Sequence, residues 1–422
     1  MNKEQHERLI RVGKGTRMGE FMRRYWHPVA LSSQVAQPDG APLLTWLLGE
    51  RLVVFRDTNG DVGVLDDHCP HRGVSLSLGR NEECGLRCLY HGWKFAVDGR
   101  IMETPNHDSA AYRERKRARA FPVREQSGLV WTYIGEGDPP PFRTFDFDAA
   151  PAESRHAFRA NSPANYLHLW EGGVDSSHVG ILHTNDARPN WGKGRRGEQV
   201  DSSSWDKLSP SYEVEDTDYG FRYVAFREVS DSGGDRHARH VPAILPSMRI
   251  IPGHADFSIM IIEVPMTDTQ TATYQIAYSF NEPLTRQWAA NFLGFKPPLY
   301  DEEKCTVNMH FPGGLGQDRS AMDFNWSGLP AIEFEDVAMA VTLGDFEWDR
   351  SNENLVAADI AVMRLRQVLL KALDGAESGA PAPAVNQPDM SQIVAYDRVL
   401  AANEDWKAPN MRSKFAVRIE IC

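Results

Sequence analysis

The segment from Cys69 to His91, CPHRGVSLSLGRNEECGLRCLYH, constrains this chain more than any other part of its sequence. It holds three of the chain's five cysteines, and two of these are each followed closely by a histidine. The pairs are Cys69-x-His71 and Cys88-x-x-His91. Thiolate and imidazole pairs at such spacings are typical of metal sites, so we expect this segment to fold around a metal.

Four ligands of the Cys2His2 type have two interpretations. A structural zinc site usually places its two cysteines together and its two histidines together. Here each cysteine is paired with a histidine, which favours a [2Fe–2S] cluster of the Rieske type, with two cysteines on one iron and two histidines on the other. The glycine-bearing loops CPHRG and CLYHGWKF would supply backbone N–H groups to the sulfides. Cys84 has no third partner nearby, and we interpret it as a bystander.

Length and charge narrow the class of protein. A chain of 422 residues exceeds the usual size of one domain, so two domains are expected. The net charge of −12 argues against a nucleic-acid partner, because a phosphate-binding surface needs a dense basic footprint. The start of the chain lacks an apolar signal-peptide core, and no stretch approaches the roughly 20 apolar residues of a membrane span. We therefore expect a cytoplasmic protein without a membrane partner.

The order of predicted elements indicates a small β domain followed by a larger α+β domain. Two short helices are predicted within residues 1–30. LLTWLLG, RLVVFRD and DVGVLDD then predict strands joined by hairpin turns, and SGLVWTYIGEG predicts the last strand of this unit. DPPPF at 138–142 marks the boundary. Beyond it, GFRYVAFREV, FSIMIIEVP and TYQIAYSF predict strands, and residues 163–183 and 352–374 predict helices.

A second candidate metal site lies in NYLHLWEGGVDSSHVGILH, residues 165–183, as Asp175-x2-His178-x4-His183. On a helix Asp175 and His178 share a face, but His178 and His183 lie about 140° apart, which is poor geometry for binding one ion. Gly180 is where the helix could widen into a π-bulge or end. A pair of histidines on an apolar helix is more often part of a core, but the adjacent acid and the glycine favour a metal site.

Two histidines need a carboxylate to complete the facial triad of a non-haem Fe(II) site. Asp359 in ENLVAADIAVMRLRQVLLKAL is the candidate, because apolar residues three and four positions away place it on the apolar stripe of a predicted helix. A buried carboxylate needs a cation or hydrogen-bond donors nearby. An ion pair with Arg364 or Arg366 would explain Asp359 alone, whereas iron also explains the histidines. Asp349 and Glu353 are the alternatives.

Two segments carry a resemblance to a known family. NEECGLRCLYHGWKF and MGEFMRRYWHPVAL resemble the large oxygenase subunit of ring-hydroxylating (Rieske non-haem iron) oxygenases, in the phthalate 4,5-dioxygenase group. The resemblance is strongest over residues 1–185. It implies a helical segment at 1–40 packed on the catalytic domain and an all-β Rieske [2Fe–2S] domain at 41–142. It also implies an α+β catalytic domain at 143–422, with an antiparallel sheet flanked by helices and a mononuclear Fe(II).

The resemblance also implies an activity. An oxygenase component of this kind uses O2 and electrons from a separate NAD(P)H-dependent reductase, which carries flavin and a plant-type [2Fe–2S] centre. The expected reaction is hydroxylation of an aromatic acid, as in phthalate dihydroxylation. The alternative is O-demethylation or ether cleavage of a methoxylated or phenoxy aromatic acid. A Rieske electron-transfer protein without oxygenase activity would leave the residues after DPPPF without a purpose.

The motif GKGRRG at 192–197 satisfies G-x-G-x-x-G, the spacing of a dinucleotide-binding loop. No predicted strand precedes it and no βαβ unit surrounds it, so we interpret it as an ordinary loop. This interpretation agrees with oxidation of NAD(P)H by a separate reductase.

The resemblance assigns Asp175 a role other than metal ligand. In the family, the matching acid bridges the Rieske histidine of one subunit to an iron-binding histidine of the next. Here the route would run from His91 of one subunit through Asp175 of its neighbour to His178. A carboxylate that accepts N–H bonds from two imidazoles would fix both rings and span the gap. The assembly implied is a homotrimer or a stacked pair of trimers.

An aromatic carboxylate would need an arginine near the iron, because the guanidinium fork matches carboxylate geometry. Arg239 in RHARHVPAILPSMRIIP is the first candidate and Arg249 the second. For each, a surface arginine in a charged loop is the plainer interpretation. The substrate class expected is an aromatic acid or an aryl ether.

Overall fold

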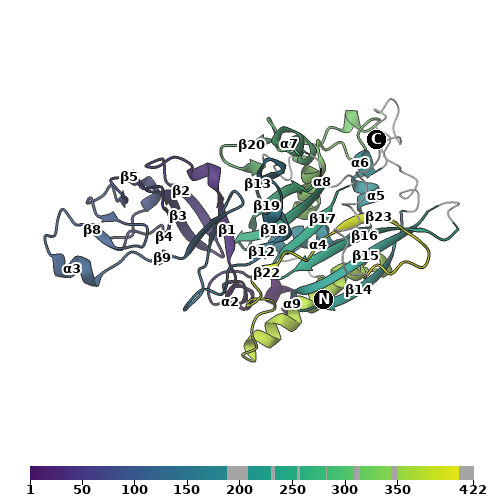
Figure 1. Cartoon of the computed structure of the whole chain (residues 1–422), viewed down its shortest axis with the longest axis horizontal. Coiled ribbons are helices and arrows are strands. Elements are labelled where there is room, and N and C mark those ends of the chain that lie inside the picture. Colours follow the sequence, from purple (N-terminus) through teal and green to yellow (C-terminus); the bar gives the residue numbers. More distant parts are fainter. Residues whose placement is uncertain are drawn as a thin grey trace.

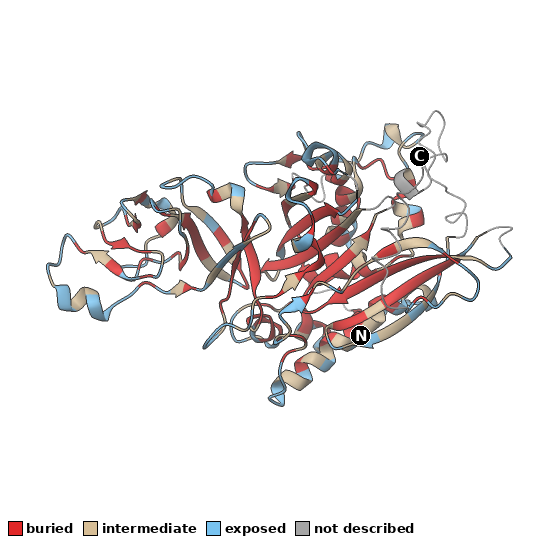
Figure 2. Cartoon of the chain, in the orientation of Figure 1, coloured by how far each residue is buried: buried red, intermediate tan, exposed pale blue. Residues whose placement is uncertain are grey.

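The chain is divided into a small β-rich part and a larger α+β part, which lie at opposite ends of an elongated molecule (Figure 1). Buried residues run through both parts and through the region where they meet (Figure 2). The predicted fold class is therefore confirmed. The computed structural model describes residues 1–187, 208–229, 233–253, 257–281, 283–307, 309, 314–343 and 350–407.

The N-terminal part is built from three small antiparallel sheets, β2-β3-β4-β9, β5-β6-β7-β8 and β1-β11-β10. The hairpin between β2 and β3 closes through Leu48 and Gly49, which both have positive φ, as a two-residue hairpin turn requires. The strands predicted here are confirmed. The elements are β1 (His27–Leu31), β2 (Leu43–Leu47), β3 (Glu50–Arg56), β4 (Val62–Asp66), β5 (Arg80–Glu82), β6 (Gly85–Arg87), β7 (Lys94–Phe95), β8 (Ile101–Glu103), α3 (Ala110–Arg115), β9 (Ala120–Phe121), β10 (Val123–Gln126) and β11 (Leu129–Thr132).

The larger part is organised around one wide sheet of strand order β14-β15-β16-β17-β18-β19-β13-β21-β20, with β23 paired to β16. All of these neighbours are antiparallel except β13 and β21. The strands are β13 (Arg155–Ser162), β14 (Ser211–Thr217), β15 (Gly220–Glu228), β16 (Arg236–Ile244), β17 (Met248–Pro252), β18 (Phe257–Thr267), β19 (Gln270–Ser279), β20 (Tyr300–Asp301), β21 (Thr306–Val307) and β23 (Tyr396–Leu400). A separate parallel pair joins β12 (Thr144–Phe145) to β22 (Asp389–Met390).

Helices cover this sheet, and the helices at the start of the chain pack against the same region (Figure 1). α4 packs between the sheet and the helices α8 and α9. The N-terminal helices contact the same region, since the Tyr166 hydroxyl donates to the Leu9 carbonyl over 2.7 Å and Arg17 pairs with Glu377 at 2.7 Å. The helices are α1 (Lys3–Ile10), α2 (Arg17–Met22), α4 (Tyr166–Val174), α5 (Val179–Leu182), α6 (Thr184–Ala187), α7 (Arg286–Leu293), α8 (Ile332–Thr342) and α9 (Ile360–Glu377).

Two predicted helices differ from the structure. The helix predicted over 163–183 ends at Val174, because the Asp175 carboxylate accepts hydrogen bonds from the N–H and hydroxyl of Ser177 and so favours a turn over a further helical residue. The helix predicted over 352–374 begins only at Ile360. Residues before it are exposed, Val356 at 62%, so the apolar stripe assumed for Asp359 does not form.

Candidate metal centres and active-site pocket

The two Cys–His loops have matching backbone hydrogen bonds. In each loop the cysteine N–H donates to the carbonyl five residues later, over 2.8 Å. In each, the glycine four residues after the cysteine, Gly73 or Gly92, donates to the cysteine carbonyl, over 2.8 and 3.0 Å. Both glycines have φ near +75°, a conformation that side chains disfavour. Each loop therefore turns tightly around its own cysteine.

The side chains of these loops fit a two-iron cluster. Cys69 and Cys88 are buried, and burial raises the pKa of the Cys69 thiol to about 11. The rings of His71 and His91 lie 4.5 Å apart, centroid to centroid, with His71 stacked on Trp93. Nδ1 of His91 is buried and has no hydrogen-bond partner among the described residues, so it is available as a ligand atom. The two thiols thus lie next to each other, as do the two imidazoles, and such pairs are what Rieske ligation requires.

The second candidate site forms where the helix after α4 is interrupted. His178 and His183 flank the single helical turn α5, and His183 ends it with φ −91° and ψ 30°. Their Nε2 atoms lie 3.2 Å apart. The sequence predicted that something must loosen this stretch, but Gly180 lies within α5. The break at Asp175 and the end of α5 bring the imidazoles together instead of a π-bulge at Gly180.

Asp336 of α8 completes this cluster, and the structure thereby corrects the prediction of Asp359. Asp336 Oδ1 lies 3.2 Å from Nε2 of His183 and 3.6 Å from Nε2 of His178. One ligand atom from each of these three side chains lies within 4.8 Å of the other two, a spacing that suits a single metal ion. Asp359 instead accepts a hydrogen bond from the Val356 N–H at the start of α9, over 2.7 Å.

The alternatives to Asp359 also lie elsewhere. Glu353 is paired with Arg350 at 2.8 Å and with Arg366. Arg366 also pairs with Glu171, and this buried network lies between α4 and α9. The other alternative, Asp349, and the motif GKGRRG at 192–197 lie outside the described residues.

A second carboxylate supports each histidine at its other nitrogen. Nδ1 of His183 lies 2.7 Å from Glu335 Oε2, and Nδ1 of His178 lies 3.4 Å from Asp175 Oδ2. The Ser327 hydroxyl donates to the other oxygen of Glu335. Such partners fix the orientation of an imidazole and raise its basicity, so both Nε2 atoms point toward the position that Asp336 also faces.

The electrostatics of the cluster favour a cation. Burial alone would lower the pKa of His183, but the carboxylates of Asp336 and Glu335 outweigh it and raise that pKa to about 10. Burial would raise the pKa of Asp336, but His183, His178 and Arg249 lower it below its usual value. Without a metal, the site therefore holds a proton where a cation would bind.

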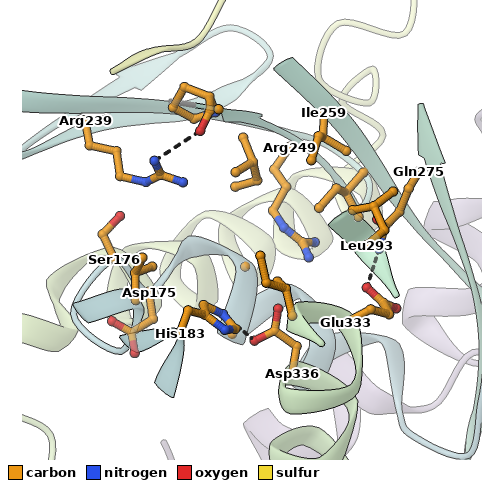
Figure 3. Close-up of a pocket in the computed structure, with 18 of the residues that line it drawn as sticks. Asp175, Ser176, His183, Arg239, Arg249, Ile259, Gln275, Leu293, Glu333 and Asp336 are labelled. Atoms are coloured by element: carbon orange, nitrogen blue, oxygen red, sulfur yellow. Dashed lines mark hydrogen bonds and ion pairs between the residues drawn. The ribbon is translucent and has the colours of Figure 1, made fainter. Parts of the chain in front are cut away.

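A pocket opens beside the cluster, between α4, α8 and the sheet (Figure 3). Its cavity measures about 120 Å³, close to the roughly 150 Å³ of an engineered cavity that binds benzene, so one aromatic ring fits. Both predicted arginines line it. They are buried, 7% exposed for Arg239 and 5% for Arg249, and each has an acidic partner, Asp397 and Glu263 respectively. The interpretation as surface arginines is therefore wrong.

Comparison with known proteins agrees with this geometry. The model of the Rieske [2Fe–2S] domain matches residues 25–122, and the model described as LigXa C-terminal domain like matches residues 132–420. The phthalate 4,5-dioxygenase oxygenase subunit of Pseudomonas putida is 36% identical over 98% of this chain and 96% of its own length. The chain belongs to the Rieske non-haem iron oxygenases. Members of this family use a Rieske [2Fe–2S] cluster, a mononuclear iron and O2.

Two further proteins place this Rieske oxygenase among its relatives. The 5,5'-dehydrodivanillate O-demethylase oxygenase subunit of a Sphingobium strain is 28% identical over 93% of this chain and 86% of its own length. The crystal structure of dicamba monooxygenase bound to dicamba has the same fold, with a TM-score of 0.59 and 20% identity over 85% of this chain and 99% of that one. As an oxygenase component, the chain works with a separate electron-donating protein. Within the described residues, every helix is too short or too polar to cross a membrane.

Sequence reasoning missed two residues of the iron-site cluster in this Rieske oxygenase, Asp336 and Glu335. The segment AIEFEDVAMAV carried a usable indication. It places three acidic residues within four positions of an otherwise apolar helix, and two of them, Glu333 and Glu335, are buried. Buried carboxylates in an apolar helix need a compensating cation or donors, which identifies α8 as a functional helix.

Proposed function

We propose that this chain hydroxylates an aromatic acid with O2, in a dihydroxylation of the phthalate type. One observation carries the proposal: a pocket of the size of one ring has the His178–His183–Asp336 cluster on one side and the buried guanidinium of Arg249 on the other. A metal that activates O2 and a donor that holds a carboxylate are the two requirements of such an enzyme.

The proposed ligands follow from the donor atoms. Cys69 and Cys88 would hold one iron of the cluster, and His71 and His91 the other. For the mononuclear iron, the two Nε2 atoms of the histidines and the carboxylate of Asp336 supply two nitrogens and one oxygen, the donor set of a facial triad. When bound, the cluster supplies electrons singly and the ferrous ion supplies open positions for O2. The protein's own part is to hold both imidazoles through Asp175 and Glu335 and to enclose the ring.

Electrons would cross between subunits, from His91 of one copy to Asp175 and His178 of the next. Leu89 and Tyr90, next to His91, are 59% and 52% exposed, so the tip of the Rieske part is an apolar surface. Asp175 and His178 line a second hollow on the outer side of α4 and α8, where Met339 and other apolar side chains are exposed. These two surfaces match in character, which supports a homotrimer or a stacked pair of trimers.

The electron donor would be an NAD(P)H-dependent reductase with flavin and a plant-type [2Fe–2S] centre. The proposed setting is the cytoplasm. Both are inferred from the type of oxygenase to which the chain belongs.

An O-demethylating oxygenase that acts on methoxylated aromatic acids is the second candidate. One of the relatives is a 5,5'-dehydrodivanillate O-demethylase subunit. Each arginine of the pocket is already paired with an acidic side chain, so the pocket suits a substrate with a single carboxylate. The two candidates differ in their products. Dihydroxylation adds both oxygen atoms of O2 to the ring, whereas O-demethylation releases formaldehyde.

The test uses the intact chain with its [2Fe–2S] cluster and iron, together with an NADH-dependent reductase and 18O2. Phthalates, benzoates, methoxybenzoates and phenoxybenzoates are compared by oxygen uptake and by mass spectrometry of the products. We expect uptake that depends on the acid and is lost in His178→Ala, while the visible spectrum of the Rieske cluster persists. Equal oxygen uptake with and without these acids would contradict an aromatic acid as substrate.

A further inference from the structure

Three residues of neighbouring strands form a row across the floor of the pocket. In the register of the sheet, Arg249 of β17 lies opposite Ile261 of β18, and Ile261 lies opposite Gln275 of β19. Residues opposite one another in adjacent strands point to the same face, and all three line the pocket. The backbones of Arg249 and Gln275 are therefore about 10 Å apart, two strand spacings. The floor is polar at both ends and apolar between them.

The Arg249 end of the row offers hydrogen-bond donors. Nη1 of Arg249 lies 2.9 Å from Glu263. Glu263 is two residues after Ile261 on β18 and therefore lies on the same face of the sheet. Its Nε is buried and has no hydrogen-bond partner among the described residues. The guanidinium passes over Gly173 of α4, where a Cβ atom would lie only 1.7 Å from Nε. The fold thus keeps the guanidinium group at the pocket, in a place that suits an anionic oxygen.

The Gln275 end of the row offers an acceptor. The Nε2 amide of Gln275 donates to the carboxyl of Glu333, and both residues are labelled in Figure 3. The other atom of this amide, Oε1, is buried and lacks a hydrogen-bond donor within the described part of the chain. Gln275 is 2% exposed. A buried carbonyl oxygen without a donor costs free energy, so this end suits a ligand hydroxyl or N–H group.

Negative charge would be poorly tolerated at the Gln275 end. Burial, together with the carboxylates of Glu263 and Asp336, raises the pKa of Glu333 to about 8. The raised pKa means that the charged form of Glu333 is unstable here, so the carboxylate of a ligand would be unstable beside it as well. Arg239, the other arginine of the pocket, is paired with Asp397 on the side of β16 and β23. It therefore does not supply a spare positive charge at Gln275.

We propose that the pocket selects aromatic acids that carry a hydroxyl or N–H donor meta or para to the carboxylate. The carboxylate binds the guanidinium of Arg249, the ring lies over Ile261, and the donor group hydrogen-bonds to Oε1 of Gln275. An ortho hydroxyl lies too close to the carboxylate to reach Gln275, and a meta or para carboxylate meets Glu333. This substrate class rests on the proposed function and narrows it.

The test measures binding of single-ring acids to the metal-loaded chain by anaerobic titration calorimetry. The ligands are benzoate, its 2-, 3- and 4-hydroxy derivatives, the 3- and 4-methoxy derivatives, and isophthalate and terephthalate. We expect the better of 3- and 4-hydroxybenzoate to bind about tenfold more tightly than benzoate, as one satisfied buried hydrogen bond allows. 2-Hydroxybenzoate should resemble benzoate, and the methoxy acids and both diacids should bind more weakly than the hydroxy acid.

Variants assign the effect to the amide. In Gln275→Met, which keeps the length of the side chain, the hydroxy acid should lose its tenfold advantage while the Kd of benzoate changes less than threefold. The matched control is Gln270→Met on the same strand, since Gln270 is exposed and outside the pocket. It should leave every Kd unchanged.

The outcomes separate this inference from the proposed function. If benzoates bind but methoxy acids or terephthalate bind as tightly as the hydroxy acids, the role of Gln275 is refuted and the aromatic-acid function stands. If none of the acids binds, both are refuted. Should Gln275→Met fail to fold, the comparison of ligands on the unaltered chain still decides the question.

Discussion

The two metal-binding regions of this Rieske oxygenase are assembled in different ways. The cluster region takes all four candidate ligands from two short loops within residues 69–91, and each loop is held by hydrogen bonds of its own backbone. The iron region takes His178 and His183 from one interrupted helix and Asp336 from another helix far along the chain. The first is a local motif and the second is a product of tertiary packing.

The difference also extends to what surrounds the ligands. Around the cysteines the stabilising groups are backbone N–H groups and glycine turns, which follow from the loop sequence itself. Around the histidines they are carboxylates, Asp175 and Glu335, that α4 and α8 bring together only when the helices pack. A local site should therefore survive changes elsewhere, whereas the packed site should respond to single carboxylates at several positions.

Removing Asp336 should have the largest effect. Asp336→Ala deletes the only carboxylate among the three proposed ligands, so we expect loss of the mononuclear iron and a fall in substrate-dependent oxygen uptake of at least about 100-fold. The visible spectrum of the cluster should remain, because its loops are held by hydrogen bonds of their own backbone. Iron per chain and the reduced-state spectrum are the measurements. Full iron content in this variant would show that another residue completes the site.

The sequence allowed the loops of one of these regions to be predicted, but it allowed only part of the other region to be predicted. The spacing of Cys69, His71, Cys88 and His91 predicts loops that the structure contains, because a loop of five residues is determined by its own glycine and hydrogen bonds. The hairpins around residues 43–66 were predicted for the same reason. Local patterns of this kind need no knowledge of what packs against them.

The proposed third ligand could not be predicted because it depends on two helix boundaries. The position of Asp359 on an apolar stripe assumed that its helix had already begun, but α9 starts at Ile360 and the preceding residues are exposed. Asp336 carried the same chemical indication within α8, yet nothing local relates α8 to α5. The arginines were identified by chemistry alone, and their burial in the pocket was missed because pocket walls come from strands distant in sequence.

Acid should weaken iron binding at the His178–His183–Asp336 site. The pKa of His183 in the metal-free site is about 10, raised above its ordinary 6.5 by Asp336 and Glu335 despite burial. Below pH 10 a proton therefore occupies the atom that iron needs, and each binding event releases it. Apparent iron affinity should fall about tenfold per pH unit, or about 100-fold from pH 8 to pH 6. Competition with a chelator at several pH values measures the iron affinity. An affinity that does not change with pH would contradict the release of a proton from His183 on iron binding.

Removing the charge of Glu335, which supports His183, should have an intermediate effect on iron binding. Glu335→Gln keeps the shape of the side chain but removes the charge that faces Nδ1 of His183, at 2.7 Å. Iron affinity should fall about 10- to 100-fold, as for other outer carboxylates of metal-binding histidines. Ser327→Ala, which removes only the hydroxyl that donates to Glu335, is the matched control and should lower the affinity less. Equal losses in the two variants would indicate a general packing defect.

The two Cys–His loops have nearly the same backbone hydrogen bonds, and one glycine substitution in each loop tests whether they are equally constrained. Gly73 and Gly92 both have φ near +75°, so alanine at either position should cost about 1 kcal/mol of unfolding free energy. A Cβ atom at Gly92 would also lie 3.1 Å from Pro105, whereas one at Gly73 meets nothing within 4 Å. Gly92→Ala should therefore destabilise the chain more than Gly73→Ala. Denaturant titration followed at the cluster absorbance compares them, and the reverse order would show that the loops differ in conformational freedom.

The smallest effect is expected at Asp359, and it sharpens the contrast with Asp336. The Asp359 carboxylate accepts one hydrogen bond from the Val356 N–H and closes the turn that starts α9. Asp359→Ala should cost about 1 kcal/mol of unfolding free energy, as the loss of one hydrogen bond does, while iron content and the Kd of a bound aromatic acid stay as in the unaltered chain. Asp359, at a helix start, would then stabilise the fold, and the role of metal ligand that the sequence assigned to it would belong to Asp336 of α8. Loss of iron in Asp359→Ala together with retention in Asp336→Ala would restore the original assignment.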